Sequence, residues 1–267
     1  DKSTRTIISL LRISKIFLYD EPSIPEIKIN ELAEFIQKQS GISTEVRQGF
    51  FQHFRVKEKI FYQLALCRIF NLYIPFEKHK PTVEEITFED QLETTTHALN
   101  NIILYDGFEL QNIFRGIIPD SESSSDKFHI IFTTRLTCSY DCDDYRYHGR
   151  AVICSNPSII STTGIIEAPA KPRDYYLRLY EKISQGLNLD AIKHEFSGKF
   201  LEYRDERLHL VARGYALQAI FYHLTGVPFC ESKECILHNA HWQEDLLHTQ
   251  IENGKLCDQH QSILDNL

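Results

Sequence analysis

Two short-spaced pairs of potential metal ligands near the C-terminus constrain this chain more than any other feature. The first pair is Cys230-Glu-Ser-Lys-Glu-Cys235, and after 21 residues the second pair follows as Cys257-Asp-Gln-His260. A structural zinc ion takes four thiolate or imidazole ligands in a tetrahedron, and two such pairs on separate turns can supply them. The sequence therefore predicts one structural zinc ion. His238 and His241 lie between the pairs, and either could replace His260 as the fourth ligand.

The remaining cysteines are typical of a reducing environment. The chain has seven cysteines, which is an odd number, and it is too long to need disulfide staples. Cys67 lies in a helical pattern and Cys154 in an apolar strand, so we expect both to be buried thiols. Cys138 and Cys142 form a third close pair, to which the sequence assigns no role. An alternative interpretation of the C-terminal pairs is that they are ordinary buried thiols beside a surface histidine.

The composition favours a folded protein that does not bind nucleic acid. Of the 267 residues 42% are hydrophobic, and the formal net charge is −8. A surface that binds nucleic acid needs clustered basic residues, and here Lys and Arg are scattered. No run approaches the roughly eighteen apolar residues that would span a bilayer. We therefore expect a cytoplasmic protein with no membrane segment.

Hydrophobic periodicity predicts an α/β (α+β) fold with a mixed sheet that begins as a β-α-β unit. Strands are expected at 15–21 and 42–47 around a helix at 31–39, with later strands at 128–134 and 150–155. Further helices are expected at 56–70, 89–101, 173–185, 189–196 and 205–225. Turn-forming residues are so dense in 156–173 that no regular element is expected there. We treat the chain as one domain, with an α/β part at 1–204 and a long helix plus zinc-binding segment at 205–267.

One segment carries a resemblance to a known family. It reads Ala219-Ile-Phe-Tyr-His223-Leu-Thr-Gly226-Val-Pro-Phe229-Cys230-Glu-Ser-Lys-Glu-Cys235-Ile-Leu237. This resembles the archaemetzincins, zinc peptidases that carry H-E-x-x-H-x-x-G-x-x-H-C-x4-C-x-M and a distant C-x-x-C. The helix, the glycine turn and the Cys-x4-Cys spacing agree, and Cys257-x2-His260 is similar to the final pair. The resemblance covers residues 205–260 and implies a metzincin-like long helix, a structural zinc ion and an archaeal source.

The departures from that pattern concern catalysis. Ala219 stands where the first zinc-binding histidine is expected, and Ile220 where the catalytic glutamate is expected. Phe229 replaces the third histidine and Leu237 the methionine, so that only His223 remains. Alanine, isoleucine and phenylalanine neither bind zinc nor move a proton, which excludes the standard hydrolytic mechanism. The resemblance therefore predicts a catalytically inactive relative that binds a peptide or protein.

A rival interpretation keeps an active hydrolase with a relocated site. His148, Glu167 and either His223 or His209 are the candidate groups, although a lone His223 on an apolar helix is more typical of a core histidine. Arg150, Lys171 and Arg173 could bind an anionic ligand or a peptide carboxylate. Ordinary surface charge accounts for these three residues equally well.

Overall fold

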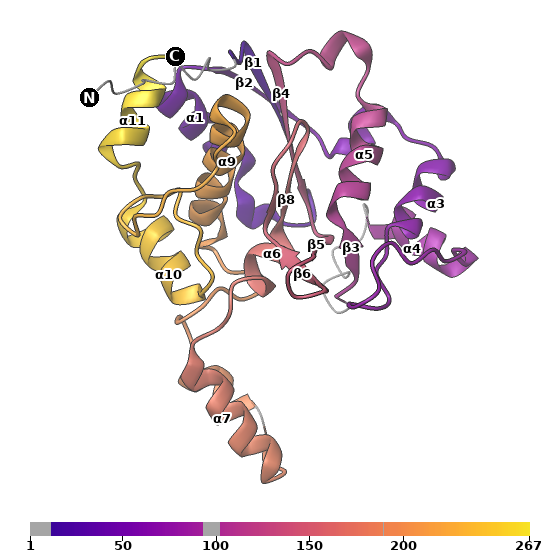
Figure 1. Ribbon diagram of the computed structural model, residues 1–267, viewed down its shortest axis with the longest axis vertical. Helices are drawn as coiled ribbons and strands as arrows, with labels where there is room; N and C mark the ends of the chain where they lie inside the picture. Colours follow the sequence, from indigo (N-terminus) through magenta and orange to yellow (C-terminus); the bar gives the residue numbers. More distant parts are fainter. Residues whose placement is uncertain (1–11, 93–101, 189) are drawn as a thin grey trace.

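The centre of the molecule is a five-stranded sheet in the order β2-β1-β4-β8-β7 (Figure 1). The computed structural model describes residues 12–92, 102–188 and 190–267. Four strands run parallel, and β7 pairs antiparallel with β8 at one edge. The strands are β1 (Lys15–Tyr19), β2 (Ser43–Arg47), β4 (Lys127–Thr133), β7 (Val152–Ile153) and β8 (Ser158–Ser161).

Both faces of this sheet are buried, which explains its apolar strands. In β1, Ile16 and Leu18 belong to the core cluster on one face, and Phe17 and Tyr19 belong to the cluster on the other. Successive side chains of a strand point to opposite faces, so a parallel sheet covered by helices on both sides needs apolar residues at nearly every position. The β-α-β start follows the predicted order.

Helices form the outer layers on each side of the sheet (Figure 1). The first layer contains α1 (Ile29–Ser40), α6 (Thr162–Glu167), α9 (Leu208–Thr225), α10 (Gln243–Leu247) and α11 (Asp258–Asp265), with the π-helical turn η4 (His248–Asn253). The opposite layer contains α2 (Phe50–Phe54), α3 (Glu58–Leu66) and α5 (Gly107–Ile117). The largest core cluster runs from Ile13 to Leu264, so both predicted parts of the chain contribute to it.

A second, smaller sheet has the order β3-β5-β6. It consists of β3 (Leu104–Asp106), β5 (Leu136–Asp141) and β6 (Arg146–Arg150), and β5 and β6 form an antiparallel hairpin. Leu136, Cys138 and Tyr147 bury one face of this hairpin. The helix α4 (Val83–Leu92) packs against α3. The short turn η1 (Pro25–Ile27) lies against α9, and η3 (Asp120–Glu122) contacts β2 through the Arg47–Glu122 ion pair.

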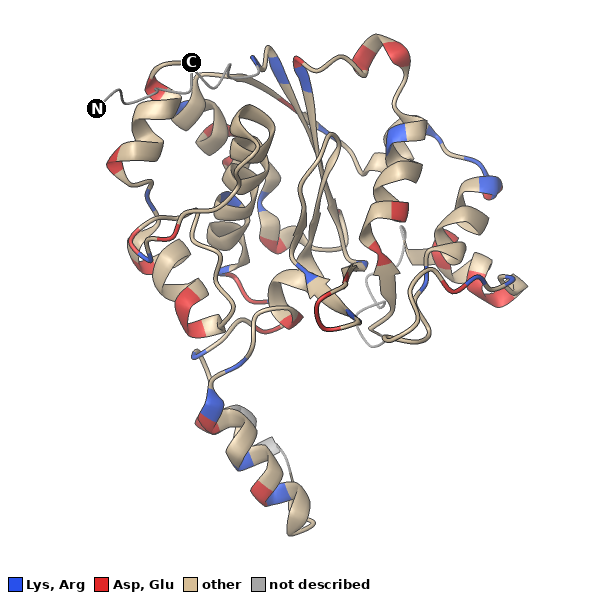
Figure 2. Ribbon diagram, viewed as in Figure 1, with Lys and Arg blue, Asp and Glu red and all other residues tan. Residues whose placement is uncertain are grey.

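Two helices project from the body as an arm (Figure 1). They are α7 (Arg173–Ser184) and α8 (Asp190–Glu195), and they enclose a small cluster around Phe196 and Phe200. Figure 2 shows basic and acidic residues interspersed along the helices. Within the three described ranges, none of the helices combines the length and apolar character needed to cross a bilayer.

The predicted fold class is confirmed, but some element boundaries are wrong. The stretch 156–173, expected to be irregular, contains the fully buried strand β8 and the helix α6. The helix expected at 89–101 begins earlier, at Val83, and residues 93–101 lie outside the described part. The long helix begins at Leu208 rather than 205 and ends at Thr225 as predicted.

Candidate metal centre

The loop after α9 carries the first cysteine pair. Gly226 ends the helix in the left-handed conformation with φ of 77°, which glycine adopts at little cost. The chain then pairs with itself, because the Cys230 amide donates to the Leu237 carbonyl at 3.0 Å. A second tight turn is closed by the Cys235 amide, which donates to the Ser232 carbonyl at 3.2 Å. Cys235 is fully buried and Cys230 is half-buried.

The second pair lies at the start of α11. Cys257 is the N-cap residue of this helix, and its carbonyl accepts from the Gln261 amide at 2.9 Å. His260 is in the first turn, so its side chain lies on the same side as that of Cys257. The ring of Phe221 on α9 packs edge-on against the His260 ring, with 5.2 Å between centroids. These contacts fix the orientation of the imidazole.

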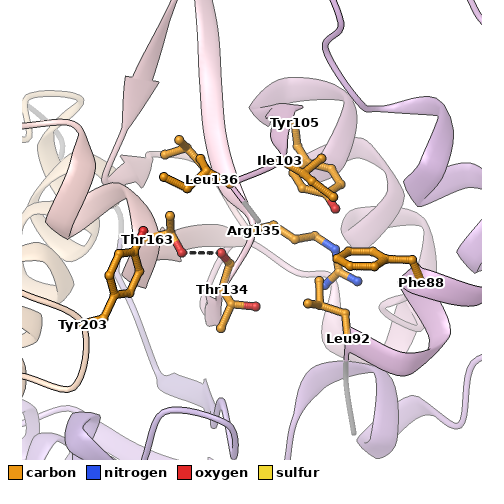
Figure 3. Close-up of a pocket in the computed structure, with 10 residues that line it drawn as sticks. Phe88, Leu92, Ile103, Tyr105, Thr134, Arg135, Leu136, Thr163 and Tyr203 are labelled. Carbon is orange, nitrogen blue, oxygen red and sulfur yellow. Dashed lines mark hydrogen bonds between the residues drawn. The ribbon is translucent and has the colours of Figure 1, made fainter. Parts of the chain in front are cut away.

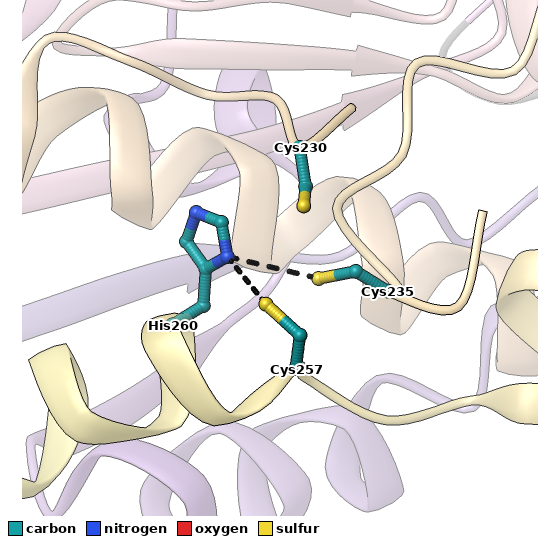
Figure 4. A group of neighbouring side chains, drawn as sticks. All are labelled: Cys230, Cys235, Cys257 and His260. Atoms are coloured by element: carbon teal, nitrogen blue, oxygen red, sulfur yellow. Dashed lines mark hydrogen bonds between the residues drawn. The ribbon is translucent and has the colours of Figure 1, made fainter. Parts of the chain in front are cut away.

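The four side chains converge on one point (Figure 4). The Sγ atoms of Cys230, Cys235 and Cys257 and one ring nitrogen of His260 all lie within 4.8 Å of one another. The Nδ1 atom of His260 is 3.0 Å from Cys257 Sγ and 3.8 Å from Cys235 Sγ. A tetrahedral zinc site has ligand-to-ligand distances of about 3.5–3.8 Å, because Zn–S and Zn–N bonds are about 2.3 and 2.0 Å. The arrangement fits a Cys3His site for one metal ion.

The four side chains of this cluster differ in how easily they reach the protonation state that binds a metal ion. Burial lowers the pKa of His260, which keeps the imidazole neutral and able to donate a lone pair. Burial opposes ionisation of Cys257, but hydrogen bonds from the His260 amide and the neighbouring thiols lower its pKa overall. Burial raises the pKa of Cys235 to about 12. A bound cation would be the charge that favours the thiolate form of this buried ligand.

The two alternative histidines are not part of this group. The Nδ1 of His238 lies 3.2 Å from the Cys230 carbonyl oxygen, to which it is hydrogen-bonded. His241 lies further along the chain and lines a surface groove. In the described part of the chain, the cluster within 4.8 Å contains His260 and neither of the other two.

The segment of α9 that resembles a peptidase motif is packed into the core. Ala219 and Ile220 are completely buried, as is Leu237. Phe229 is 38% exposed in the loop that follows. The remaining histidine, His223, donates from Nε2 to the Ser125 carbonyl at 2.7 Å, and its ring packs on Phe128. Burial lowers the pKa of His223, so the neutral ring is favoured.

The structure does not bring the relocated catalytic candidates together. His148 is on β6 with its Nε2 2.7 Å from Asp144, and His209 contacts the Glu206 carbonyl at the start of α9. Glu167 is at the end of α6. Among the described residues, the ligand atoms of His148 instead group with Asp141 and Asp144, and Arg146 pairs with Asp144 at 2.8 Å.

A groove of about 460 Å³ lies beside the metal centre, and Arg150, one of the basic residues suggested for a peptide carboxylate, lines it. One wall is formed by residues 151–154 in and around β7. A second wall is α9, through Tyr215, Gln218 and Tyr222, and the third is the cysteine loop, through Pro228, Phe229 and 239–241. Gln218 joins two walls, because its Nε2 donates to the His238 carbonyl at 3.2 Å.

A second cavity, near Arg135 and Tyr203, is far smaller (Figure 3). Its volume is about 20 Å³, which is enough for a single water molecule. Thr163 donates across it to the Thr134 carbonyl at 2.6 Å, and the hydroxyl of Tyr203 is buried without a hydrogen-bond partner. This cavity suits an ordered water molecule rather than a ligand.

Comparison with known proteins gives one match. No curated protein and no solved structure matches the chain. Residues 12–267 match the model of a family described as "Probable metallopeptidase family (DUF6775)". Because the match covers nearly the whole length, this chain belongs to that probable metallopeptidase family.

Proposed function

We propose that this protein is an archaemetzincin-like member of the family that binds an extended peptide segment without cleaving it. The observation that carries the proposal is the composition of α9. Ala219 and Ile220, at the positions of a zinc-binding histidine and a catalytic glutamate, are apolar and fully buried. His223 uses its Nε2 on the Ser125 carbonyl. A helix with this content offers neither a set of metal ligands nor a general base for hydrolysis.

The retained metal is proposed to be a structural zinc ion at Cys230, Cys235, Cys257 and His260. Four protein ligands leave no open position for water or substrate, which is typical of structural rather than catalytic zinc. The ion would join the cysteine loop to α11 and so hold one wall of the groove in place. Its contribution would be to folding and shape.

The groove supports the proposal that the ligand is an extended chain. Four consecutive residues, 151–154, line the groove. Because successive side chains of a strand point to opposite faces, we infer that the main chain of these residues contributes to this wall. The Ala151 carbonyl accepts from the Ser161 amide of β8 at 2.9 Å. In an antiparallel pair, the main-chain groups of successive residues point alternately to the partner strand and away from it. The N–H and C=O groups of Val152 and Cys154 therefore point to the outer edge of β7. A peptide could add to this edge as a further strand.

A second candidate function is an active metal hydrolase with a relocated site. The grouping of Asp141, Asp144 and His148 favours it, because these three could ligate a metal at the tip of the β5–β6 hairpin. Against it, Arg146 already forms an ion pair with Asp144, and Glu167 and His223 belong to other parts of the structure. We therefore rank this second.

Metal stoichiometry and turnover separate the two candidates. Purified protein should contain one zinc ion per chain and should not cleave a randomised peptide library. His223→Gln should leave the zinc content unchanged, while Cys257→Ser should lower the zinc affinity. Two metal ions per chain, together with chelator-sensitive cleavage that is lost in His148→Ala, would replace the binding function with the hydrolase.

A further inference from the structure

The charge of the groove is unusual for this molecule. The protein has a formal net charge of −8, yet the described residues that line the groove include no Asp or Glu. They include one arginine, Arg150, at the end of β6 where the chain enters β7. The other lining residues are mostly apolar or aromatic, among them Phe108, Tyr222 and Phe229. Such a groove fits an apolar ligand that carries one negative charge.

Arg150 is held in position but has free hydrogen-bond donors. Its Nε donates to Ser139 Oγ at 2.7 Å, and its carbonyl accepts from Thr137 Oγ1 at 2.9 Å. Ser139 also lines the groove. Among the described residues, no carboxylate lies within 4.0 Å of the Arg150 guanidinium, although Arg146, Arg178 and Arg207 each have an acidic partner. The two terminal nitrogens of Arg150 can therefore bind a carboxylate through paired, charge-assisted hydrogen bonds.

Gln218 is a second, independent sign of a ligand. This residue is 1% exposed, lines the groove, and holds His238 through its Nε2. Its Oε1 is buried without a hydrogen-bond partner. A buried amide oxygen without a donor costs free energy, and an N–H group of a ligand or a bound water would relieve that cost. Gln218 thus supplies an unpartnered acceptor on α9, in a groove that β7 also lines.

We infer that the groove recognises the C-terminal end of an extended peptide, with the free carboxylate on Arg150 and an apolar final side chain. This inference rests on the proposed peptide-binding function and adds the class of peptide. The direction follows from the fold, because Arg150 precedes β7 in the chain. A peptide that pairs antiparallel with β7 runs toward Arg150 and brings its C-terminus there. A single guanidinium also matches a singly charged carboxylate better than a phosphate.

The test compares two probes that differ only at their end. N-acetyl-Leu-Phe as the free acid and as the C-terminal amide are titrated into zinc-loaded protein, and the backbone amide signals of Val152 and Cys154 are followed by NMR. The acid should bind about tenfold more tightly than the amide or better, since a charged hydrogen-bond pair is worth about 1.5–3 kcal/mol. The comparison uses the native protein, so it does not depend on the folding of a variant.

Arg150→Gln should reduce acid binding to the level of the amide. Arg146→Gln, four residues earlier on the same strand and the same face of the hairpin, removes an equal charge and should leave the preference intact. If acid and amide bind equally, or if Arg150→Gln keeps the preference, the carboxylate inference is overturned while peptide binding stands. If neither probe shifts Val152 or Cys154, the proposed peptide-binding function itself fails.

Discussion

The Nδ1 atom of His260 lies 3.0 Å from Sγ of Cys257, within the first turn of α11. The other ring nitrogen is therefore turned away from the cysteines (Figure 4). If the cluster binds zinc, the imidazole ligand should be Nδ1 and the thiolates should supply the other three bonds. The short spacing of Cys257 and His260 produces this geometry, because residues three positions apart on a helix have their side chains on the same face.

We predict that cobalt added to metal-free protein gives the intense near-ultraviolet absorption of three thiolate–cobalt bonds. Cys257→Ser should weaken this band by about a third and loosen metal binding. Loss of zinc should destabilise the fold, by about 4 kcal/mol where free zinc had been a thousandfold above Kd. Cys142→Ser, at an exposed cysteine outside the cluster, is the matched control and should change neither the spectrum nor the stability. An unchanged spectrum in Cys257→Ser would remove this residue from the site.

Substitution by alanine at two helical glycines should change the stability of the protein in opposite directions. A Cβ at Gly164 in α6 would overlap the Arg150 carbonyl, which is main chain and cannot move aside, whereas a Cβ at Gly116 in α5 meets nothing within 4 Å. Gly164→Ala should destabilise the protein by about 1–3 kcal/mol, and Gly116→Ala should stabilise it by up to about 1 kcal/mol. Urea unfolding measures both. Equal effects would mean that α6 can shift away from the β6–β7 junction.

The parts that the sequence predicts well depend on local patterns. The strand 15–19 is a continuous apolar run and is buried on both faces, and the helix 29–40 has a clear helical period whose apolar residues form its buried face. The pairs Cys230/Cys235 and Cys257/His260 were recognisable from ligand type and spacing, and their side chains do lie together. The binding of zinc there stays a prediction.

The parts that the sequence missed depend on contacts between distant segments. β8 and α6 lie in a stretch rich in turn formers, where Ser161 caps α6 by accepting from the Gly164 amide at 2.8 Å and donates to the Arg135 carbonyl at 2.7 Å. Burial between β4 and β7 thus overrides local propensity. The groove combines β7, α9 and the cysteine loop, and no single stretch of sequence carries a signal for it.

Stability should fall in mild acid because of His129. This residue is 1% exposed, with its Nδ1 3.0 Å from the Tyr19 hydroxyl and its Nε2 2.9 Å from the Glu122 carbonyl. Burial, assisted by the charges of Arg47 and Lys127, lowers its pKa, and the carbonyl and charge of Glu122 oppose the shift. The folded state therefore binds fewer protons than the unfolded state, and stability is lost as pH falls below the ordinary histidine pKa of about 6.5.

The difference in unfolding free energy between the native protein and His129→Gln isolates this effect. It should be constant above about pH 7 and shrink toward pH 5, by about 1.4 kcal/mol for each pH unit that separates the folded and unfolded pKa values. His223→Gln serves as a comparison, because burial lowers the pKa of His223 in the same direction. A difference that does not change with pH would show that His129 titrates normally in the folded state.

The last prediction concerns Glu89, which is completely buried between two arginines. Its carboxylate accepts from Arg68 at 2.6 Å, from Arg135 at 3.0 Å and from the Tyr105 hydroxyl at 2.8 Å. Figure 3 shows Arg135 extended toward Phe88 of α4 beside this site. Glu89→Gln keeps the shape but leaves two buried cations facing a neutral group, so it should cost about 3–5 kcal/mol. Asp90→Asn, at the exposed neighbouring position, should change stability by no more than about 0.5 kcal/mol. If the two variants unfold at the same urea concentration, the second carboxylate near Arg68, that of Glu85 at 3.6 Å, is sufficient to balance the charge.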